Sequence, residues 1–196
     1  MSTDNTSGSE ARTFVDPEQK FDNPARLAEL RPAETLQRIG LASDGVLCDI
    51  GAGTGVFTLP AAAITHNAVY ALDVSDDMLS IIARKSELAG ATNIYRVKVT
   101  EAGFNVAPGV ADIVLMCSML HGIPNQTQFL ADATALLKPD GRIAVIEFHK
   151  RETPMGPPPD RRMSRDELLQ TANAAGLSQV EAFDLGENFY CAVFMK

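Results

Sequence analysis

The fold of this chain is decided by one stretch, Val46-Leu47-Cys48-Asp49-Ile50-Gly51-Ala52-Gly53-Thr54-Gly55-Val56-Phe57-Thr58. Its apolar beginning predicts a buried strand. The glycines that follow can take positive φ and leave room for a ligand beside the backbone. A helix is expected to begin at this turn. A strand-to-helix turn of this kind presents free backbone N–H groups, which by themselves indicate only a nucleotide-like or anionic ligand.

A second apolar run, Val69-Tyr70-Ala71-Leu72, ends in Asp73. The dinucleotide fingerprint G-x-G-x-x-G would need glycine at positions 51, 53 and 56, but position 56 is Val. An acidic residue, Asp49, stands two positions before the first glycine. The order of strand, D-x-G-x-G-x-G, helix, strand and acidic residue resembles the class I S-adenosylmethionine (SAM)-dependent methyltransferases.

The resemblance implies a doubly wound, Rossmann-like α/β domain. Its seven-stranded sheet is expected to be mostly parallel, with an antiparallel last strand. We expect this domain to span residues 14–196, after a disordered lead over residues 1–13. Within the family, the chain is most similar to the compact type 11 and quinone-biosynthesis-like branch, which methylates small molecules. The implied cofactor is SAM, and the implied partner is a small-molecule methyl acceptor.

The resemblance also assigns the cofactor site. Gly51, Gly53 and Gly55 are expected to form the turn against the methionine and ribose parts of SAM, and Asp49 to order that turn near the amino group. Asp73 is assigned to the ribose hydroxyls, and Val74 and Met78 to the sides of adenine. Thr100 and Glu101 are assigned to the adenine amino group. Cys117 is assigned to the site as the end of the fourth strand, expected over residues 112–117. Which of Thr100 and Glu101 meets adenine is left open, because the family often has an aspartate there. The stretch Phe21-Asp22-Asn23-Pro24-Ala25-Arg26 is expected to cover the methionine end.

Later segments complete the expected domain. We expect a helix over residues 124–137, a turn at Lys138-Pro139-Asp140-Gly141, and a strand over residues 142–148. Residues 150–162 are rich in proline, which favours a stiff extended loop that walls a substrate pocket, although such a loop can also be a linker. A capping box, Ser164-Arg165-Asp166-Glu167, begins a further helix. Two last strands, over residues 180–185 and 189–194, form a hairpin.

Three side chains are candidates for catalysis. Methyl transfer from SAM is an in-line displacement, so positioning matters most and a base is needed only when the acceptor must lose a proton. His121 follows the fourth strand, and Glu147 and His149 end the fifth, so all three are expected at the ligand edge of the sheet. The alternatives are that the histidines are solvated or hydrogen-bonding residues and that Glu147 pairs with Arg161 or Arg162. Tyr190 is expected to pack in the core.

Composition limits the partners. The formal charge of −8 disfavours nucleic acid, because phosphate backbones are bound mainly by Lys and Arg. No apolar run is long enough for a membrane span, and residues 1–10 do not resemble a secretory signal. Cys48, Cys117 and Cys191 lack metal-ligand spacing, so no metal is expected, and buried thiols in a reducing cytoplasm are favoured. A homodimer is left open.

Two other functions remain as alternatives. One is a SAM-binding protein that has lost catalysis and acts as a regulator. The other is an NAD-linked oxidoreductase, which Val56 and the absence of a second nucleotide-binding half both oppose. The methyl acceptor itself cannot be read from the sequence, and a small apolar or weakly polar molecule is expected from the Met, Phe and Pro content of the loops.

Overall fold

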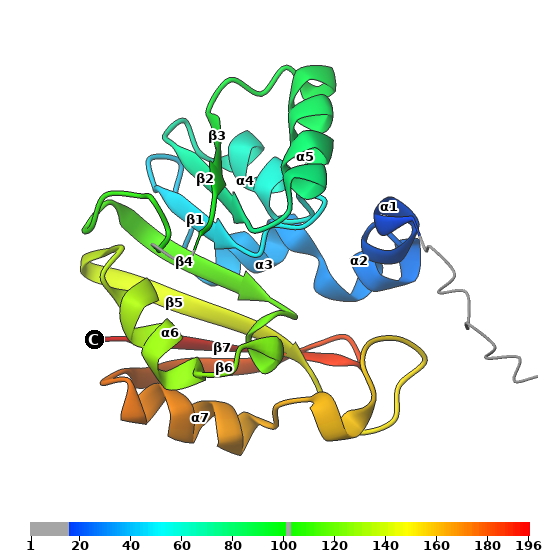
Figure 1. Cartoon of the computed structure of the whole chain (residues 1–196), viewed down its shortest axis with the longest axis vertical. Coiled ribbons are helices and arrows are strands. Elements are labelled where there is room, and N and C mark those ends of the chain that lie inside the picture. Colours follow the sequence, from blue (N-terminus) through cyan, green and yellow to red (C-terminus); the bar gives the residue numbers. More distant parts are fainter. Residues whose placement is uncertain (1–15, 101–102) are drawn as a thin grey trace, which may run out of the picture.

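The computed structural model describes residues 16–100 and 103–196. The expected lead over residues 1–13 and the candidate Glu101 lie outside the described residues. Seven strands are present in this part of the chain, namely β1 (Leu47–Ile50), β2 (Val69–Asp73), β3 (Ile94–Lys98), β4 (Ala111–Cys117), β5 (Leu137–Phe148), β6 (Ser178–Leu185) and β7 (Phe189–Met195). They form one sheet in the order β3-β2-β1-β4-β5-β7-β6 (Figure 1).

The strand directions confirm the predicted fold class. β1 is parallel to β2 on one side and to β4 on the other, and β3 and β5 continue the parallel pairing outward. The last strand, β7, is antiparallel to both of its neighbours, β5 and β6. Because the chain moves from β1 out to β3 and then returns to β4, the strand order reverses beside β1. Sheets of this kind bind ligands at that point, outside the carboxyl ends of the strands.

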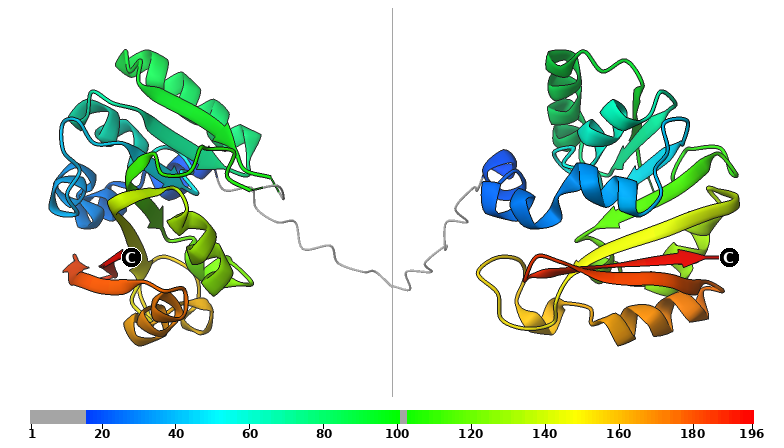
Figure 2. Two further views of the ribbon diagram at one scale, coloured as in Figure 1. Left: turned by 90° about the vertical axis from the view of Figure 1, so that its left-hand side faces the viewer. Right: turned by 180° about the vertical axis from the view of Figure 1, so that it is seen from behind.

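Helices cover both faces of the sheet. They are α1 (Pro17–Phe21), α2 (Pro24–Leu30), α3 (Pro32–Arg38), α4 (Thr58–Ile64), α5 (Asp76–Ala89), α6 (Gln126–Thr134) and α7 (Arg165–Ala174), with short 3-10 helices at Leu120–Gly122 and Pro159–Arg161. Figures 1 and 2 show α6 and α7 on one face and α3 and α4 on the other. Neighbouring residues of β5 lie in the two core layers on opposite faces of the sheet. Val145 belongs to the layer with Leu130 and Leu168, whereas Ile146 belongs to the layer with Leu36 and Phe57.

Side-chain caps begin several helices. Asn23 accepts a hydrogen bond from Ala25 N at the start of α2, and Ser75 caps α5. Ser164 and Glu167 make both bonds of the predicted capping box at the start of α7.

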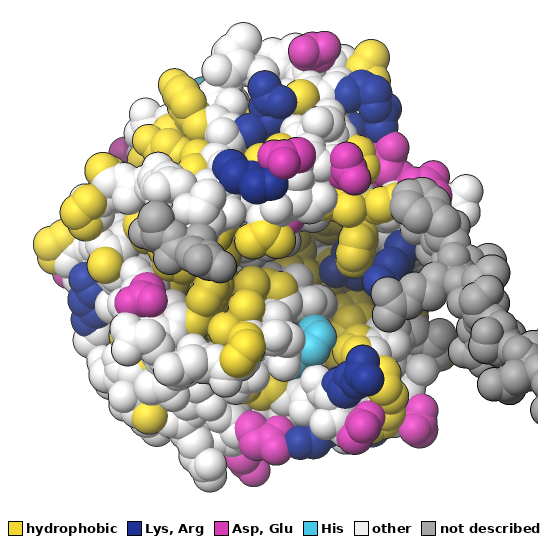
Figure 3. Space-filling model, in the orientation of Figure 1, with side chains coloured by type: hydrophobic (Ala, Val, Ile, Leu, Met, Phe, Trp, Pro, Cys, Tyr) yellow, Lys and Arg dark blue, Asp and Glu magenta, His cyan; other side chains and the backbone are white. Residues whose placement is uncertain are grey.

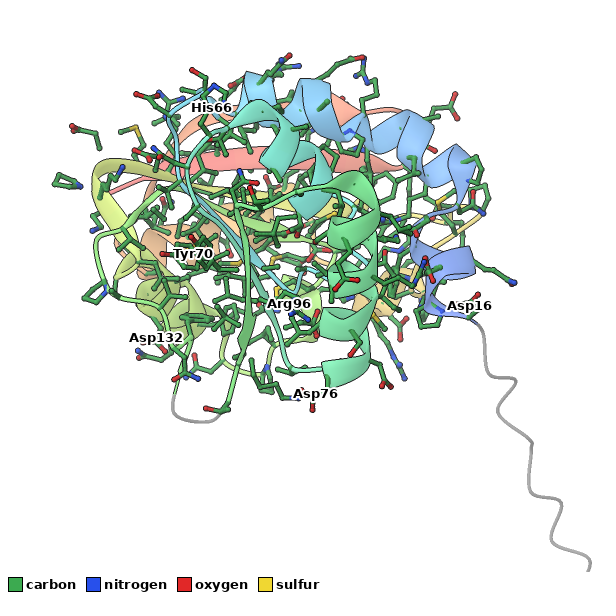
Figure 4. The ribbon with its side chains drawn as sticks, turned by 90° about the horizontal axis from the view of Figure 1, so that it is seen from above. Asp16, His66, Tyr70, Asp76, Arg96 and Asp132 are labelled. Atoms are coloured by element: carbon green, nitrogen blue, oxygen red, sulfur yellow. The ribbon has the colours of Figure 1, made fainter. Side chains whose placement is uncertain are left out.

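The helix α5 is packed on β3 beside the ligand edge. Viewed from above, Asp76 stands at the start of α5, and Arg96 of β3 lies beside the helix (Figure 4). Arg96 Nη1 donates to Leu79 O at 3.5 Å, and Ile82 of α5 is fully buried. These contacts join the outer strand to the helix that follows Asp73.

The segment before Arg142 differs from the prediction. α6 ends at Thr134, and β5 already begins at Leu137, so residues 138–141 lie within the strand and not in a separate turn. They form an irregularity in its pairing, because Ala111 lies opposite Leu137 while Ile113 lies opposite Arg142. Gly141 approaches β4 so closely that an added Cβ would lie 2.9 Å from Ala111 O. The backbone contact to β4 thus continues through the predicted turn.

Candidate functional site

The glycine turn after β1 uses its backbone N–H groups inside the protein. Gly51 N and Ala52 N donate to Leu72 O at 2.8 and 3.1 Å, and Gly53 N donates to Asp73 Oδ2 at 2.8 Å. The expectation of free N–H donors is therefore wrong at these three positions. A ligand that enters here meets a backbone whose donors are already engaged.

What the glycines supply is space and backbone freedom. The φ angles of Gly51, Gly53 and Gly55 are +70°, +55° and +85°, which side chains other than glycine rarely adopt. A Cβ on Gly51 would lie 3.1 Å from Met119 Cγ, and one on Gly55 would lie 2.5 Å from Leu59. Larger residues would therefore disturb the turn even without a ligand.

The carboxylate of Asp73 ties the glycine turn to the start of α5. Its Oδ2 accepts from Gly53 N, and its Oδ1 accepts from Ser75 N at 2.9 Å. Each carboxylate oxygen has a second lone pair, so both can accept a further hydrogen bond from a ligand. Asp73 is 8% exposed and faces a cavity. The arrangement suits a pair of adjacent hydroxyl groups.

Asp49 is a buried carboxylate at the end of β1. Its Oδ2 accepts from Thr58 Oγ1 at 2.6 Å. Burial raises the pKa of Asp49 to about 6, the Thr58 hydroxyl works against this rise, and the nearby charge of Asp73 adds to it. A cationic ligand group beside Asp49 would stabilise its ionised form.

The cavity that these carboxylates face, here called the turn cavity, has a volume of about 310 Å³. It is bounded by the glycine turn, the end of β2, the end of β4 and the segment from α1 to α2. Seven of the cofactor residues expected from the sequence line it, namely Asp49, Gly51, Gly53, Asp73, Val74, Met78 and Cys117. Gly55 and Thr100 are not in its lining. Thr100 instead pairs with Gly103.

Arg26 places a buried cation on the wall of the turn cavity. It is 8% exposed, its Nη1 donates to Phe21 O at 3.1 Å, and its Nη2 lies 3.5 Å from Cys117 Sγ. Within residues 16–100 and 103–196, no carboxylate forms a salt bridge with Arg26. Buried charges are normally paired, so Arg26 is suited to an anionic ligand group.

His121 and Glu147 form a pair, as their expected shared edge allows. His121 Nδ1 lies 2.7 Å from Glu147 Oε2, and His121 N donates to Glu147 Oε1 at 3.1 Å. An ionised carboxylate can only accept, so the neutral ring carries its proton on Nδ1 and its basic lone pair on Nε2. The hydrogen bond to Glu147 raises the pKa of His121, while burial acts in the opposite direction.

The alternative expectation, that Glu147 pairs with Arg161 or Arg162, is therefore wrong. Glu147 is 1% exposed, and its two oxygens bond to His121 rather than to Arg161 or Arg162. Arg162 is directed instead at the proline-rich loop. Its guanidinium donates to Pro157 O, His149 O, Arg151 O and Met155 O at 2.6, 2.9, 2.7 and 3.1 Å.

The loop that Arg162 holds walls a second cavity, here called the loop cavity, of about 380 Å³. His121, Phe148, Met155 and Pro157 lie in its lining. Three residues line both this cavity and the turn cavity, namely Phe21, Arg26 and Ser118. Figure 3 shows this face of the molecule, with hydrophobic side chains around a hollow, a histidine at its edge and Lys or Arg side chains near it. The two cavities are therefore neighbours across one shared wall.

His149 is not brought to this wall. Its Nε2 lies 2.8 Å from Asp184 Oδ1, its ring packs 5.5 Å from that of Tyr190, and it lines neither the turn cavity nor the loop cavity. Tyr190 is fully buried, as expected, and its hydroxyl donates to Met163 O at 2.8 Å.

Ser118 and Met119 also line the turn cavity, in the loop after β4 that is expected beside the ligand because it follows an apolar strand. Ser118 has φ of +55°, although it is not a glycine, and its N–H donates to Ile146 O at 2.7 Å. This left-handed backbone turns the chain from β4 toward His121. The position directly after an apolar strand was the available signal, since such positions lie at the ligand edge.

Three further observations concern the cysteines, metal ligands and membrane spans. The three cysteines are free thiols, and burial raises the pKa of each of them. Across the described ranges, no group of three or more His, Cys, Asp or Glu side chains could hold a metal ion. No helix within residues 16–100 and 103–196 is long and apolar enough to cross a membrane.

Comparison with known proteins places this geometry among methyltransferases. Residues 48–143 match the model of a methyltransferase domain family. Over 150 residues the chain is 29% identical to the ubiquinone biosynthesis O-methyltransferase of Methylococcus capsulatus, with 73% of this chain and 62% of that protein covered. It is 34% identical over 110 residues to the demethylmenaquinone methyltransferase of Tropheryma whipplei, with 56% and 44% covered. The chain thus spans less than two thirds of these relatives.

A solved structure matches over nearly its whole length. The SAM-dependent methyltransferase from Aquifex aeolicus superimposes with a TM-score of 0.85 at 25% identity, and the match covers 92% of this chain and 98% of that one. The similarity therefore includes the terminal hairpin and the segment before β1, and not only the glycine turn.

Proposed function

Since this chain belongs to the class I SAM-dependent methyltransferases, we propose that it transfers the methyl group of SAM to a small-molecule acceptor. The observation that carries the proposal is the shared wall between the turn cavity and the loop cavity, because methyl transfer needs cofactor and acceptor side by side. What the named relatives methylate is not carried over to this chain.

The residues of the turn cavity fit SAM by charge and by hydrogen-bonding type. Asp73 can accept from both ribose hydroxyls, and Val74 and Met78 offer apolar contacts to adenine. Asp49 would stabilise the ammonium group of the methionine part, and the unpaired guanidinium of Arg26 would bind its carboxylate. The roles of Thr100, Glu101 and Gly55 remain predictions, with Gly55 serving the shape of the turn.

When bound, SAM supplies a methyl group on a positively charged sulfur. The residues of the chain hold the acceptor in line with that group and exclude water, which can contribute about 7–11 kcal/mol. For an acceptor with a hydroxyl group, His121 Nε2 accepts the hydroxyl proton as the oxygen attacks. Glu147 holds the imidazole by its Nδ1 proton and stabilises the imidazolium that forms.

The alternative of a SAM-binding regulator without catalysis is tested by product formation. Calorimetric titration with SAM, S-adenosylhomocysteine (SAH) and NAD in parallel comes first. Binding of SAM and SAH without NAD supports the proposal, and failure of SAM and SAH to bind removes it. Formation of SAH with an acceptor then separates an enzyme from a regulator, and His121→Gln should lower that rate without changing SAM affinity.

The location and assembly of the protein are also proposals. Three free thiols whose pKa values are raised by burial suit a reducing compartment, which supports the expected cytoplasmic location. The homodimer stays a prediction that sedimentation of the purified protein would test.

A further inference from the structure

The loop cavity carries information about the acceptor beyond the reaction type. This inference rests on the proposed function, because it takes the loop cavity as the acceptor site. The cavity of about 380 Å³ shares Phe21, Arg26 and Ser118 with the turn cavity and contains His121 in its lining. A molecule held there would have its reacting atom between the base and the cofactor.

The side chains that line the loop cavity favour an apolar, aromatic body. Phe21, Phe148, Met155 and Pro157 line it. Phe148 cannot move away freely, since its ring packs 4.2 Å from that of Phe189 and the guanidinium of Arg162 lies 4.9 Å from it on one face. Rings and a thioether make favourable contacts with an aromatic ligand.

Gly156 lets the loop lie directly against the ring of Phe148. Its φ is +92°, and an added Cβ would lie 2.7 Å from the ring of Phe148. Only glycine therefore allows the loop to pass so close to this ring. The loop and the ring together form a fixed wall rather than a surface that closes after binding.

The charged groups of the loop cavity all have one sign. They are Lys20 and Arg26, whereas His121 acts as the unprotonated base and bonds to Glu147, and none of the described residues in the lining is an Asp or Glu. The nearest acidic residues along the chain are already engaged, since Glu18 pairs with Arg84 and Asp22 with Lys85. In a chain with a formal charge of −8, this is a local surplus of positive charge.

Lys20 is the cation that this surplus leaves available to the acceptor. Within the described ranges its ammonium group makes no salt bridge, and it lies 5.0 Å from the centre of the Phe21 ring. Arg26 faces the turn cavity as well and would be engaged by the cofactor carboxylate. Lys20 lines only the loop cavity and not the turn cavity.

We propose that the methyl acceptor is an aromatic hydroxy acid. Its ring lies between Phe21 and Phe148, and its carboxylate forms an ion pair with Lys20. In the reaction the hydroxyl O–H bond breaks and its proton passes to His121 Nε2. The oxygen forms a bond to the methyl carbon, and the C–S bond breaks with its electron pair left on sulfur. The carboxylate of the acceptor is unchanged. This replaces the weakly polar acceptor expected from composition.

Calorimetry in the presence of saturating SAH tests this directly. The probes are 3,4-dihydroxybenzoate and its methyl ester, which has the same ring and hydroxyls without the charge. We expect the acid to bind about three- to tenfold more tightly than the ester, the range for one charge-assisted contact at a partly exposed site. Lys20→Gln should remove most of that preference and leave SAH affinity unchanged.

Lys138→Gln is the matched control, because Lys138 pairs with Asp112 at the start of β5 and lines neither cavity. Its preference for the acid should equal that of the unaltered protein. Equal affinity for acid and ester, no binding of either, or an unchanged preference in Lys20→Gln would each overturn the proposal while SAH still binds. Failure of SAH itself to bind would instead overturn the methyltransferase function.

Discussion

Arg162→Met should free the proline-rich loop while leaving the sheet intact. Arg162 is 5% exposed, and its guanidinium donates to four backbone carbonyls, at 2.6, 2.7, 2.9 and 3.1 Å. A hydrogen bond from a charged donor contributes about 1.5–3 kcal/mol, but carbonyls of a surface loop can turn to water, so the four contributions do not add. We expect a loss of about 2–4 kcal/mol in the free energy of unfolding.

Urea denaturation measures the loss in the free energy of unfolding, and hydrogen exchange measures the release of the proline-rich loop. Exchange over residues 149–158 should accelerate far more than exchange over β1 or β4. Arg161→Met is the control, because Arg161 is exposed and adjacent but makes none of these four bonds. Arg162→Lys should recover little, since one ammonium group cannot reach all four carbonyls. A loss below about 1 kcal/mol, or one equal to that of Arg161→Met, would refute the reasoning.

Three further predictions concern single contacts. Asp73→Ala should weaken SAM binding by about one to two orders of magnitude, because charge-assisted hydrogen bonds contribute about 1.5–3 kcal/mol each; unchanged affinity by calorimetry contradicts its ribose role. Glu147→Gln removes the contact that raises the pKa of His121, so the unprotonated base persists to lower pH and the acid limb of the kcat/KM profile should move to lower pH. A limb that does not move would exclude His121 as the base. Tyr190→Phe should lower the free energy of unfolding by about 1–2 kcal/mol in urea, because a buried hydroxyl no longer donates to Met163 O.

Local signals in the sequence were sufficient for much of the fold. The apolar run before Gly51 and the run ending in Asp73 are the strands β1 and β2, because each is short, buried and bounded by residues that stop a strand. Ser75 and Ser164 begin helices for a reason contained within a few residues, the hydrogen bond to the free N–H groups of the first turn.

Contacts between distant segments could not be derived in this way. The choice of His121 over Arg162 as the partner of Glu147 depends on how the end of β4 lies beside the end of β5, and both partners fit the charge rule equally well. Lys20, which the sequence did not single out, lines one cavity with Met155 and Pro157 of the proline-rich loop because these distant segments meet in the fold. Sequence placed the candidates at one edge and left their pairing undecided.

The attachment of α1 sets how the cofactor can be exchanged. None of its residues is buried, and Glu18 and Asp22 tether it to Arg84 and Lys85 through partly exposed ion pairs. Such pairs contribute about 0–1 kcal/mol each and weaken as ions screen them. Phe21, which lines both cavities, ends this exposed helix, where Thr54 Oγ1 donates to Asp22 at 2.6 Å and Arg26 donates to Phe21 O at 3.1 Å. We expect an excursion of this short helix to open both cavities, and release of the bound product to accelerate as ionic strength rises.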